Sequence, residues 1–234
     1  SIKMFETAVA IKPDYAEVYN NLGITYMQLE QLDDAVESFN KAIVIIPEYT
    51  EAHNNLGITL KKLNQLDEAV KSYERALTIK PDYAEAHNNL GNALKVLGRL
   101  DEAVKCYEQT LNIKPNFAEA HNNLGNVLKD LGQLDAAVKS FKKAIVNKPG
   151  FAEAYYNYSL TLMELGQLDG AMKSFDKAIA IRPDYAEAHN NLGITLKELN
   201  QLDESVKSYE RALAIKPDYA EAHNNLGIAL KNLG

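Results

Sequence analysis

The stretch Pro81–Lys114 reads PDYAEAHNNLGNALKVLGRLDEAVKCYEQTLNIK, and the rest of the chain repeats this pattern with small changes. Seven prolines mark the period, each 34 residues from the next: Pro13, Pro47, Pro81, Pro115, Pro149, Pro183 and Pro217. A period between about 20 and 50 residues indicates a solenoid, in which each repeat buries its apolar face only against its neighbours. The sequence therefore predicts an array with a long continuous surface instead of one enclosed pocket.

A first helix is predicted near the start of this stretch. Asp82 with Glu85 three residues later is a capping-box pattern, which predicts a helix from there to about Leu97. Gly98 follows at a position suited to a left-handed residue. The same position holds glycine or asparagine in four other repeats: Asn64, Gly132, Gly166 and Asn200.

A second helix completes the repeat. Asp101 is the expected cap of a helix from Glu102 to about Ile113, which Pro115 ends because proline cannot continue a helix. Helices of this length are marginal alone, so packing must stabilise them.

The predicted core is regular. Ala86, Leu90 and Leu94 share one face of the first helix, while Ala103 and Tyr107 recur at helical spacing in the second. The position of Tyr107 is aromatic in every full repeat: Phe39, Tyr73, Phe141, Phe175 and Tyr209. We expect these small and aromatic residues to interlock between helices.

The Leu90-Gly91 pair, Ala103, Tyr107 and Pro115 together resemble the tetratricopeptide repeat family across the whole chain. The resemblance implies an all-α fold, an alpha-alpha superhelix of antiparallel helix pairs whose first helices line a concave groove. Full repeats are expected at 16–49, 50–83, 84–117, 118–151, 152–185 and 186–219. Residues 1–15 and 220–234 would be a lone second and a lone first helix, as expected of a piece cut from a longer array.

Opposite the predicted core of the first helix lies a polar stripe. Its most constant member is the second asparagine of each repeat: Asn21, Asn55, Asn89, Asn123, Asn157, Asn191 and Asn225. Seven residues further on, the repeats read Gln28, Lys62, Val96, Asp130, Glu164, Glu198 and Asn232, so they have diverged elsewhere. The asparagines persist although Asn costs roughly half a kcal/mol against Ala inside a helix.

This row has two interpretations, which the sequence leaves open. An asparagine side chain carries a donor and an acceptor, so the row could hold an extended peptide by its backbone. Alternatively, each amide bonds a neighbouring helix and fixes the stacking. The row, with 118–129 (AEAHNNLGNVLK), is similar to the tetratricopeptide portion of O-linked N-acetylglucosamine transferases and to bacterial and archaeal scaffold arrays. The former resemblance implies that groove asparagines contact extended substrate peptides.

Further groove residues are predicted beside this row. They comprise the first asparagines Asn54, Asn88 and Asn122 and the edge lysines Lys95 and Lys129. The repeat 152–185 departs from the pattern: its stripe contains Tyr156, Leu160 and Met163, so that the usual Asn and Lys give way to Tyr and Met. Exposed aromatic residues and methionines are frequent interface anchors, so we expect a hot spot for an apolar ligand side chain there.

Several classes of function are not supported. The formal net charge of −7 argues against a nucleic-acid groove, which needs a basic stripe. No apolar run approaches the roughly 20 residues that span a bilayer. The histidines come one per repeat, and equivalent helices lie roughly 8–10 Å apart, too far to share one zinc ion. No catalytic triad or phosphate loop is present, so we expect no enzyme and no cofactor.

The predicted function is a protein-interaction module that binds an extended peptide or protein segment in its groove. Two alternatives stay open. The array could recruit substrates for a larger enzyme such as a glycosyltransferase. It could also assemble with itself, because the apolar residues of its last helix (towards Gly234) complement those of its first (from Ser1).

Overall fold

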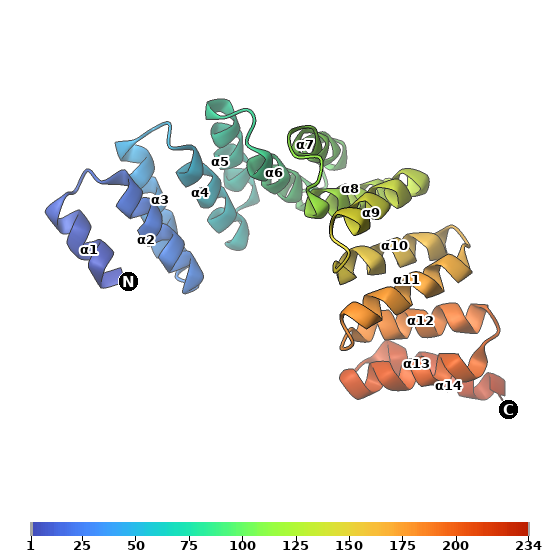
Figure 1. Cartoon of the computed structure of the whole chain (residues 1–234). Helices are drawn as coiled ribbons and strands as arrows, with labels where there is room; N and C mark the ends of the chain where they lie inside the picture. The colour runs from blue at the N-terminus through green and yellow to red at the C-terminus, as the bar shows by residue number, and fades with distance from the viewer. Residues whose placement is uncertain (1, 234) are drawn as a thin grey trace. The chain divides into compact units, whose positions relative to one another are not determined.

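The computed structural model describes residues 2–233, and all the regular secondary structure in this range is α-helical (Figure 1). The first helices of successive repeats are α2 (Ala16–Gln28), α4 (Thr50–Lys62), α6 (Ala84–Val96), α8 (Ala118–Asp130), α10 (Ala152–Glu164), α12 (Ala186–Glu198) and α14 (Ala220–Leu233). The second helices are α1 (Ile2–Ile11), α3 (Leu32–Ile45), α5 (Leu66–Ile79), α7 (Leu100–Ile113), α9 (Leu134–Asn147), α11 (Leu168–Ile181) and α13 (Leu202–Ile215). The predicted all-α class is confirmed.

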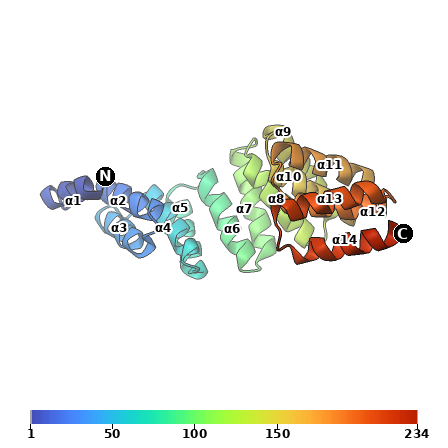
Figure 2. The ribbon, with the colours of Figure 1, turned by 90° about the horizontal axis from the view of Figure 1, so that it is seen from below.

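The chain forms two compact units, one ending at Pro115 and containing α1–α7, the other beginning at Asn116 and containing α8–α14. Within each unit, consecutive helices pack side by side and run antiparallel (Figures 1 and 2). First helices also contact each other directly: α2 touches α4, and α4 touches α6, while α8, α10, α12 and α14 touch in the same order. Each unit therefore has one face built from first helices alone.

The turn inside each repeat uses the predicted left-handed residue. Gly98 has φ 75° and Asn64 has φ 59°, and Gly132, Gly166 and Asn200 are equally left-handed. The repeat 16–49 was not predicted to follow this rule, yet Glu30 adopts φ 59° at the same position. A left-handed backbone costs a residue with a side chain roughly 1–2 kcal/mol, so Glu30 is a strained site.

The predicted helix caps are wrong. Helix α6 begins at Ala84 with Tyr83 as its N-cap, and α7 begins at Leu100 with Arg99 as its N-cap; neither cap residue makes a side-chain capping bond. The Tyr83 N–H instead bonds the Lys80 carbonyl, which closes a turn that leaves Asp82 outside the helix. Asp101 lies inside the first turn of α7, where a carboxylate suits the helix dipole without capping it.

The predicted core residues are buried. Ala86, Leu90 and Leu94 of α6 and Ala103 and Tyr107 of α7 all have little or no exposure. A glycine lies under the aromatic ring in most repeats, and a Cβ atom added to Gly91 would come within 2.8 Å of the Tyr107 ring. The ring can therefore be buried at this position only because glycine has no side chain.

The loop that joins successive repeats is held by two contacts of its own. The cation before the proline lies over the aromatic ring after it, as with Lys80 over Tyr83 at 5.4 Å and Arg182 over Tyr185 at 3.3 Å. The histidine of the next helix then bonds the proline carbonyl, with 2.9 Å between His87 Nε2 and the Pro81 oxygen. Both contacts fix how each first helix enters its repeat. Between residues 2 and 233, no helix is long and apolar enough to cross a membrane.

Candidate functional site

In the full repeats that contain it, the first asparagine is buried, which corrects its predicted place in an open groove. Exposed fractions are 4% for Asn54, 8% for Asn88 and 2% for Asn122. These side chains lie on the part of the helix surface that neighbouring helices cover. They therefore belong to the packing of the array and are not offered to a ligand.

The second asparagine donates a hydrogen bond to the first asparagine of the preceding repeat. Nδ2 of Asn55 lies 3.1 Å from Oδ1 of Asn20, and Nδ2 of Asn89 lies 3.1 Å from Oδ1 of Asn54. The other unit contains the same bond from Asn157 to Asn122 and from Asn225 to Asn190, each at 3.1 Å. The asparagines thus form a ladder between first helices, as the stacking interpretation expects.

The ladder uses only part of each second amide. An asparagine amide has two N–H donors and a carbonyl acceptor, and each ladder bond uses one donor. Among the described residues, the Oδ1 atoms of Asn55, Asn89 and Asn157 have no hydrogen-bond partner. These amides are half-buried, whereas Asn21 on the first helix of its unit is exposed. The ladder therefore orients a row of amides that keep one acceptor and one donor available.

Tyr156 takes the place of the first asparagine in the repeat 152–185. Its hydroxyl accepts the ladder bond from Asn191 Nδ2 at 2.9 Å. The ring lies 4.8 Å from the Tyr185 ring and 5.9 Å, edge-on, from the Phe175 ring. Burial raises the pKa of Tyr156, because the ionised phenolate would be poorly solvated there. Tyr156 therefore makes contacts that stabilise the array, and it also lies on the predicted stripe.

Leu160 and Met163 remain half-buried beside Tyr156. All three pack against the core cluster around Phe175 and Leu162, and each keeps part of its side chain exposed. The structure therefore brings the three predicted anchor residues together on α10, where Tyr156 and Met163 stand at the positions that hold Asn and Lys in most other repeats.

Charged side chains line both edges of the first-helix face. Glu85 pairs with Lys114 and Glu119 pairs with Lys148, at 3.2 Å and 2.6 Å, so loop lysines neutralise these carboxylates. On the lysine edge, Lys129 lies 3.6 Å from Glu164, and Lys95 is half-buried on α6.

Lys61 and Lys197 form no ion pair with any described residue. Burial lowers the pKa of Lys61, because little water solvates its charge.

Other candidate groups have structural roles. The Nε2 atoms of His53, His189 and His223 lie 2.9–3.0 Å from the oxygens of Pro47, Pro183 and Pro217. Because a carbonyl only accepts, Nε2 carries the proton in each ring. Burial raises the pKa of the Cys106 thiol to about 11, which leaves it unreactive at neutral pH. Residues 2–233 contain no cluster of three or more potential metal ligands.

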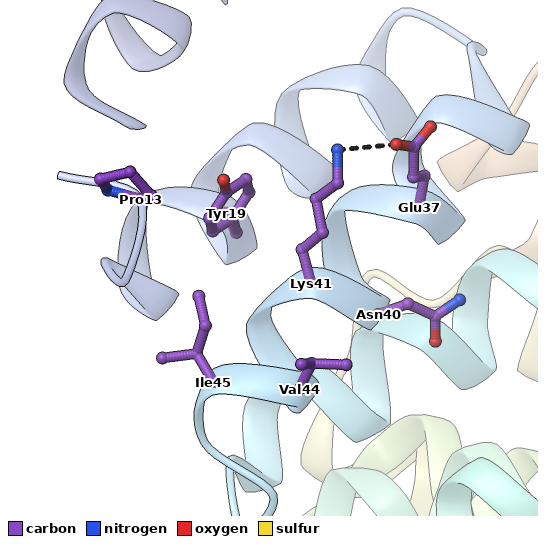
Figure 3. Close-up of a pocket in the computed structure, with 7 residues that line it drawn as sticks. All are labelled: Pro13, Tyr19, Glu37, Asn40, Lys41, Val44 and Ile45. Atoms are coloured by element: carbon purple, nitrogen blue, oxygen red, sulfur yellow. Dashed lines mark ion pairs between the residues drawn. The ribbon is translucent and has the colours of Figure 1, made fainter. Parts of the chain in front are cut away.

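A surface hollow of about 400 Å³ lies away from the predicted stripe (Figure 3). Pro13, Tyr19, Asn40, Val44 and Ile45 line it, and an ion pair of 2.6 Å between Lys41 and Glu37 borders it. The paired charges neutralise one another, so the hollow has no charge to select a ligand.

Sequence reasoning missed three features of the site: the ladder bonds, the histidine–proline bonds and the cation–aromatic pairs. Each has a signal in the repeat alignment. In each ladder bond the donor asparagine lies 35 residues after the acceptor, which is one residue more than the period. Such a ladder therefore requires two adjacent asparagines in each repeat, and the recurring Asn-Asn pair supplies them. In the same way, histidine recurs six residues after proline in five of the seven repeats.

Comparisons with known protein families identify the repeat. A profile described as "TPR repeat" matches residues 59–98, 91–132, 160–200 and 195–234, which together are more than half of the chain. A profile described as "Tetratricopeptide repeat" matches residues 16–49 and 118–151. No curated protein matches the chain.

Solved structures match over most of the chain. YrrB, described as a TPR protein with an unusual peptide-binding site, is 26% identical with a TM-score of 0.67, covering 81% of this chain and 97% of YrrB. PilW, described as a type IV pilus biogenesis factor, is 25% identical with a TM-score of 0.81, covering 90% and 98%. A chain of the APC/C Cut9–Hcn1 complex shares the fold at 18% identity and a TM-score of 0.80; this chain spans 45% of its length.

Proposed function

Because the chain belongs to the tetratricopeptide repeat family and is a protein–protein interaction module, we propose that its first-helix faces each bind an extended peptide. The second-asparagine row makes the main contact: Asn21, Asn55 and Asn89 in one unit, and Asn123, Asn157, Asn191 and Asn225 in the other. The peptide-binding site described for YrrB, a structure 26% identical, supports a peptide as the ligand class.

The observation that carries this proposal is the unused half of the second amides. Asn55 and Asn89 each keep an acceptor and a donor after making the ladder bond. Each residue of an extended peptide presents its own N–H and C=O on the same side, so a fixed amide can pair with both. Since this pairing involves only the backbone, the row favours extended segments with weak sequence preference.

Side-chain preference comes from the flanking residues. The apolar surface of Tyr156, Leu160 and Met163 suits a hydrophobic ligand side chain, because burying it there excludes water from both partners. Lys61 and Lys197 favour acidic side chains elsewhere on the ligand, since neither lysine has an ion-pair partner among the described residues.

The test compares two neighbouring asparagines with different exposure. Random 12-residue peptides would be selected on the full chain, and their affinity measured for Asn55→Ala and Asn54→Ala. Asn55→Ala removes both the contact and a ladder bond, whereas Asn54→Ala removes only a ladder acceptor that a ligand cannot reach. We expect Asn55→Ala to weaken binding about five- to tenfold, as for one lost hydrogen bond of about 1–1.5 kcal/mol, and Asn54→Ala, which frees Asn89 from the ladder but removes no ligand contact, to weaken it less. Equal losses would assign the row to stacking alone.

A second candidate is that the array recruits substrate peptides for a larger enzyme of the O-linked N-acetylglucosamine transferase kind. The recurrence of the second asparagine in every repeat favours it. Sequencing the gene on both sides of residues 1–234 distinguishes this candidate from the first. A glycosyltransferase domain in the same reading frame supports recruitment, whereas a reading frame that encodes repeats alone contradicts it.

A further inference from the structure

The second residue of every first helix is a glutamate, and in two repeats this glutamate holds a cation of the chain itself. Glu85 pairs with Lys114 at 3.2 Å, and Glu119 pairs with Lys148 at 2.6 Å. Glu187 is the equivalent residue of α12 and is half-buried, as Glu119 is. However, Glu187 makes no ion pair and no side-chain hydrogen bond with any described residue. A half-buried carboxylate favours a partner, so Glu187 is suited to bind a cation from outside the chain.

The chain's own loop cations do not neutralise this edge of the second unit. The two lysines that form the pairs lie 29 residues after their glutamates, and the residue 29 after Glu187 is Lys216. The Nζ atom of Lys216 instead lies over the Tyr219 ring, 4.9 Å from its centroid, and forms no ion pair with a described residue. Arg182, which stands in the same relation to Glu153, also lies over a tyrosine ring and forms no such pair. The edge is therefore negatively charged from Glu153 to Glu187.

Two hydrogen bonds place Glu187 between α10 and α14. Asn190 and Asn191 follow Glu187 by three and four residues, so the three side chains share one face of α12. Nδ2 of Asn191 donates to the Tyr156 hydroxyl of α10 at 2.9 Å. Nδ2 of Asn190 donates to Oε1 of Glu221 on α14 at 3.2 Å. Because α12 contacts a first helix on each side, Glu187 lies inside the array and not at its end (Figure 1).

The charge of Glu187 acts on the tyrosines around it. Burial raises the pKa of Tyr156, and the carboxylates of Glu187 and Glu221 raise it further. Burial also raises the pKa of Tyr219 to about 12, and the same two carboxylates add to the increase. These four residues therefore lie close together, and we call them the tyrosine–glutamate cluster. Such a cluster attracts a positive charge, since carboxylates pair with cations and the faces of aromatic rings attract them.

We propose that the tyrosine–glutamate cluster binds a lysine or arginine side chain of an extended peptide, with its charge at Glu187 and its alkyl stem against Tyr156. This inference rests on the proposed peptide binding and names the chemistry of one ligand side chain. A long basic side chain suits a half-buried carboxylate, because its stem covers apolar surface while its charged end stays near water. The asparagine row passes through Asn191, one helical turn from Glu187, so a peptide held by the row can present a side chain there.

The test is a double-mutant cycle between Glu187 and the ligand. Random 12-residue peptides are selected on the full chain, and the tightest binder is the probe. In copies of it, each basic residue in turn is replaced by its uncharged analogue, acetyl-lysine or citrulline. Calorimetry measures the affinity of each peptide for the wild type, Glu187→Gln and Glu204→Gln. Glu204 is the matched control, because it is a first-turn glutamate without an ion pair that lies exposed on the second helix α13.

The inference predicts coupling between the two changes. We expect the probe to contain a basic residue whose neutralisation weakens binding to the wild type about fivefold, as for one ion pair with an aromatic contact. Glu187→Gln should weaken binding of the unmodified probe by a similar factor, after which neutralisation should reduce affinity by less than about twofold. Glu204→Gln should behave as the wild type does. Selected peptides without basic residues, or effects of the two changes that add independently, would overturn the inference.

Copies of the probe that are N-methylated at single backbone amides distinguish this inference from the proposed function. If the asparagine row binds and the cluster does not, N-methylation weakens binding and the uncharged analogues leave it unchanged. If the cluster binds and the row does not, the cycle shows coupling and N-methylation has no effect. A full chain that retains no peptide in the selection would contradict both proposals.

Discussion

The Tyr107 hydroxyl donates a hydrogen bond of 2.8 Å to Oδ1 of Asn92, whereas the Tyr73 hydroxyl, one repeat earlier, is buried with no partner among residues 2–233. The difference lies in the first helix, where Ile58 occupies the position of Asn92. Both rings are fully buried, and burial raises the pKa of both phenols. The tyrosine hydroxyl at this position therefore has a hydrogen-bond partner in the repeat of Tyr107 and none among the described residues in the repeat of Tyr73.

Replacing these two tyrosines should have opposite effects. Tyr73→Phe removes a buried hydroxyl without a partner, so we expect the free energy of unfolding to rise by about 1 kcal/mol. Tyr107→Phe removes a formed hydrogen bond and should lower it by about 0.5–1.5 kcal/mol. Urea denaturation of both variants and the wild type checks the pair, and equal effects of the two changes would contradict the assigned roles.

Glu30→Gly should stabilise the chain. Glycine relieves a left-handed backbone that costs roughly 1–2 kcal/mol with a side chain present. The change also removes the exposed ion pair with Lys62, worth about 0.2–1 kcal/mol. By these figures the net gain lies between about 0 and 1.8 kcal/mol, with a central value of about 1 kcal/mol. Glu30→Asn, the residue found at 64 and 200, is the control; a lower denaturation midpoint for Glu30→Gly would show that the ion pair outweighs the strain.

The sequence predicted the helix pairs and the core because both follow from spacing alone. A 34-residue register places Leu90 and Tyr107 on inner faces whatever their exact partners are. The start of α6 was misplaced for a local reason: Asp82 matches a capping pattern, but the turn closed by Tyr83 and Lys80 moves the N-cap one residue along, to Tyr83.

The candidate site was only partly predictable. Periodicity places Asn88 and Asn89 on the same polar side of the helix, yet the neighbouring helices decide that one is buried and the other half-exposed. Which of the two asparagines is buried depends on how the repeats stack, and the residue pattern of a single helix does not specify the stacking. The left-handed backbone of Glu30 was equally hard to predict, because glutamate does not favour that conformation. Only its place in the repeat, equivalent to that of Asn64, indicates it.

Stability should decrease as the pH falls below about 6.5, and His189 should contribute to this decrease. Burial lowers the pKa of His189 below the value of about 6.5 for an exposed imidazole. The folded state therefore favours the neutral ring, so its contribution is complete above pH 6.5 and is lost as the pH falls towards the lower folded pKa. His189→Tyr, the residue found at 19 and 155, removes this titration. Unfolding measured between pH 7 and 5 should show a shallower slope for the variant; parallel slopes would contradict the assignment.

Tyr156 should contribute to stability as well as to binding. Tyr156→Ala removes the ladder acceptor for Asn191 and the contacts with Tyr185 and Phe175, so we expect a loss of about 2–4 kcal/mol. Tyr156→Asn restores the residue of the other repeats and should recover part of this, because its Oδ1 can accept from Asn191. Thermal unfolding of both variants separates the hydrogen bond from the ring packing, and equal midpoints would show that the ladder bond contributes nothing.

The central claim is that the second-asparagine row holds a ligand by its peptide backbone. The most direct measurement is calorimetric titration of the full chain with a selected 12-residue peptide and with copies N-methylated at single central positions. Methylation removes one backbone N–H and leaves every side chain in place, so binding through Asn55 and Asn89 predicts a weakening of about five- to tenfold at alternate positions. Alanine substitution of side chains away from the apolar anchor should change affinity less than twofold. Affinity that survives every methylation but is lost on side-chain substitution would contradict the claim.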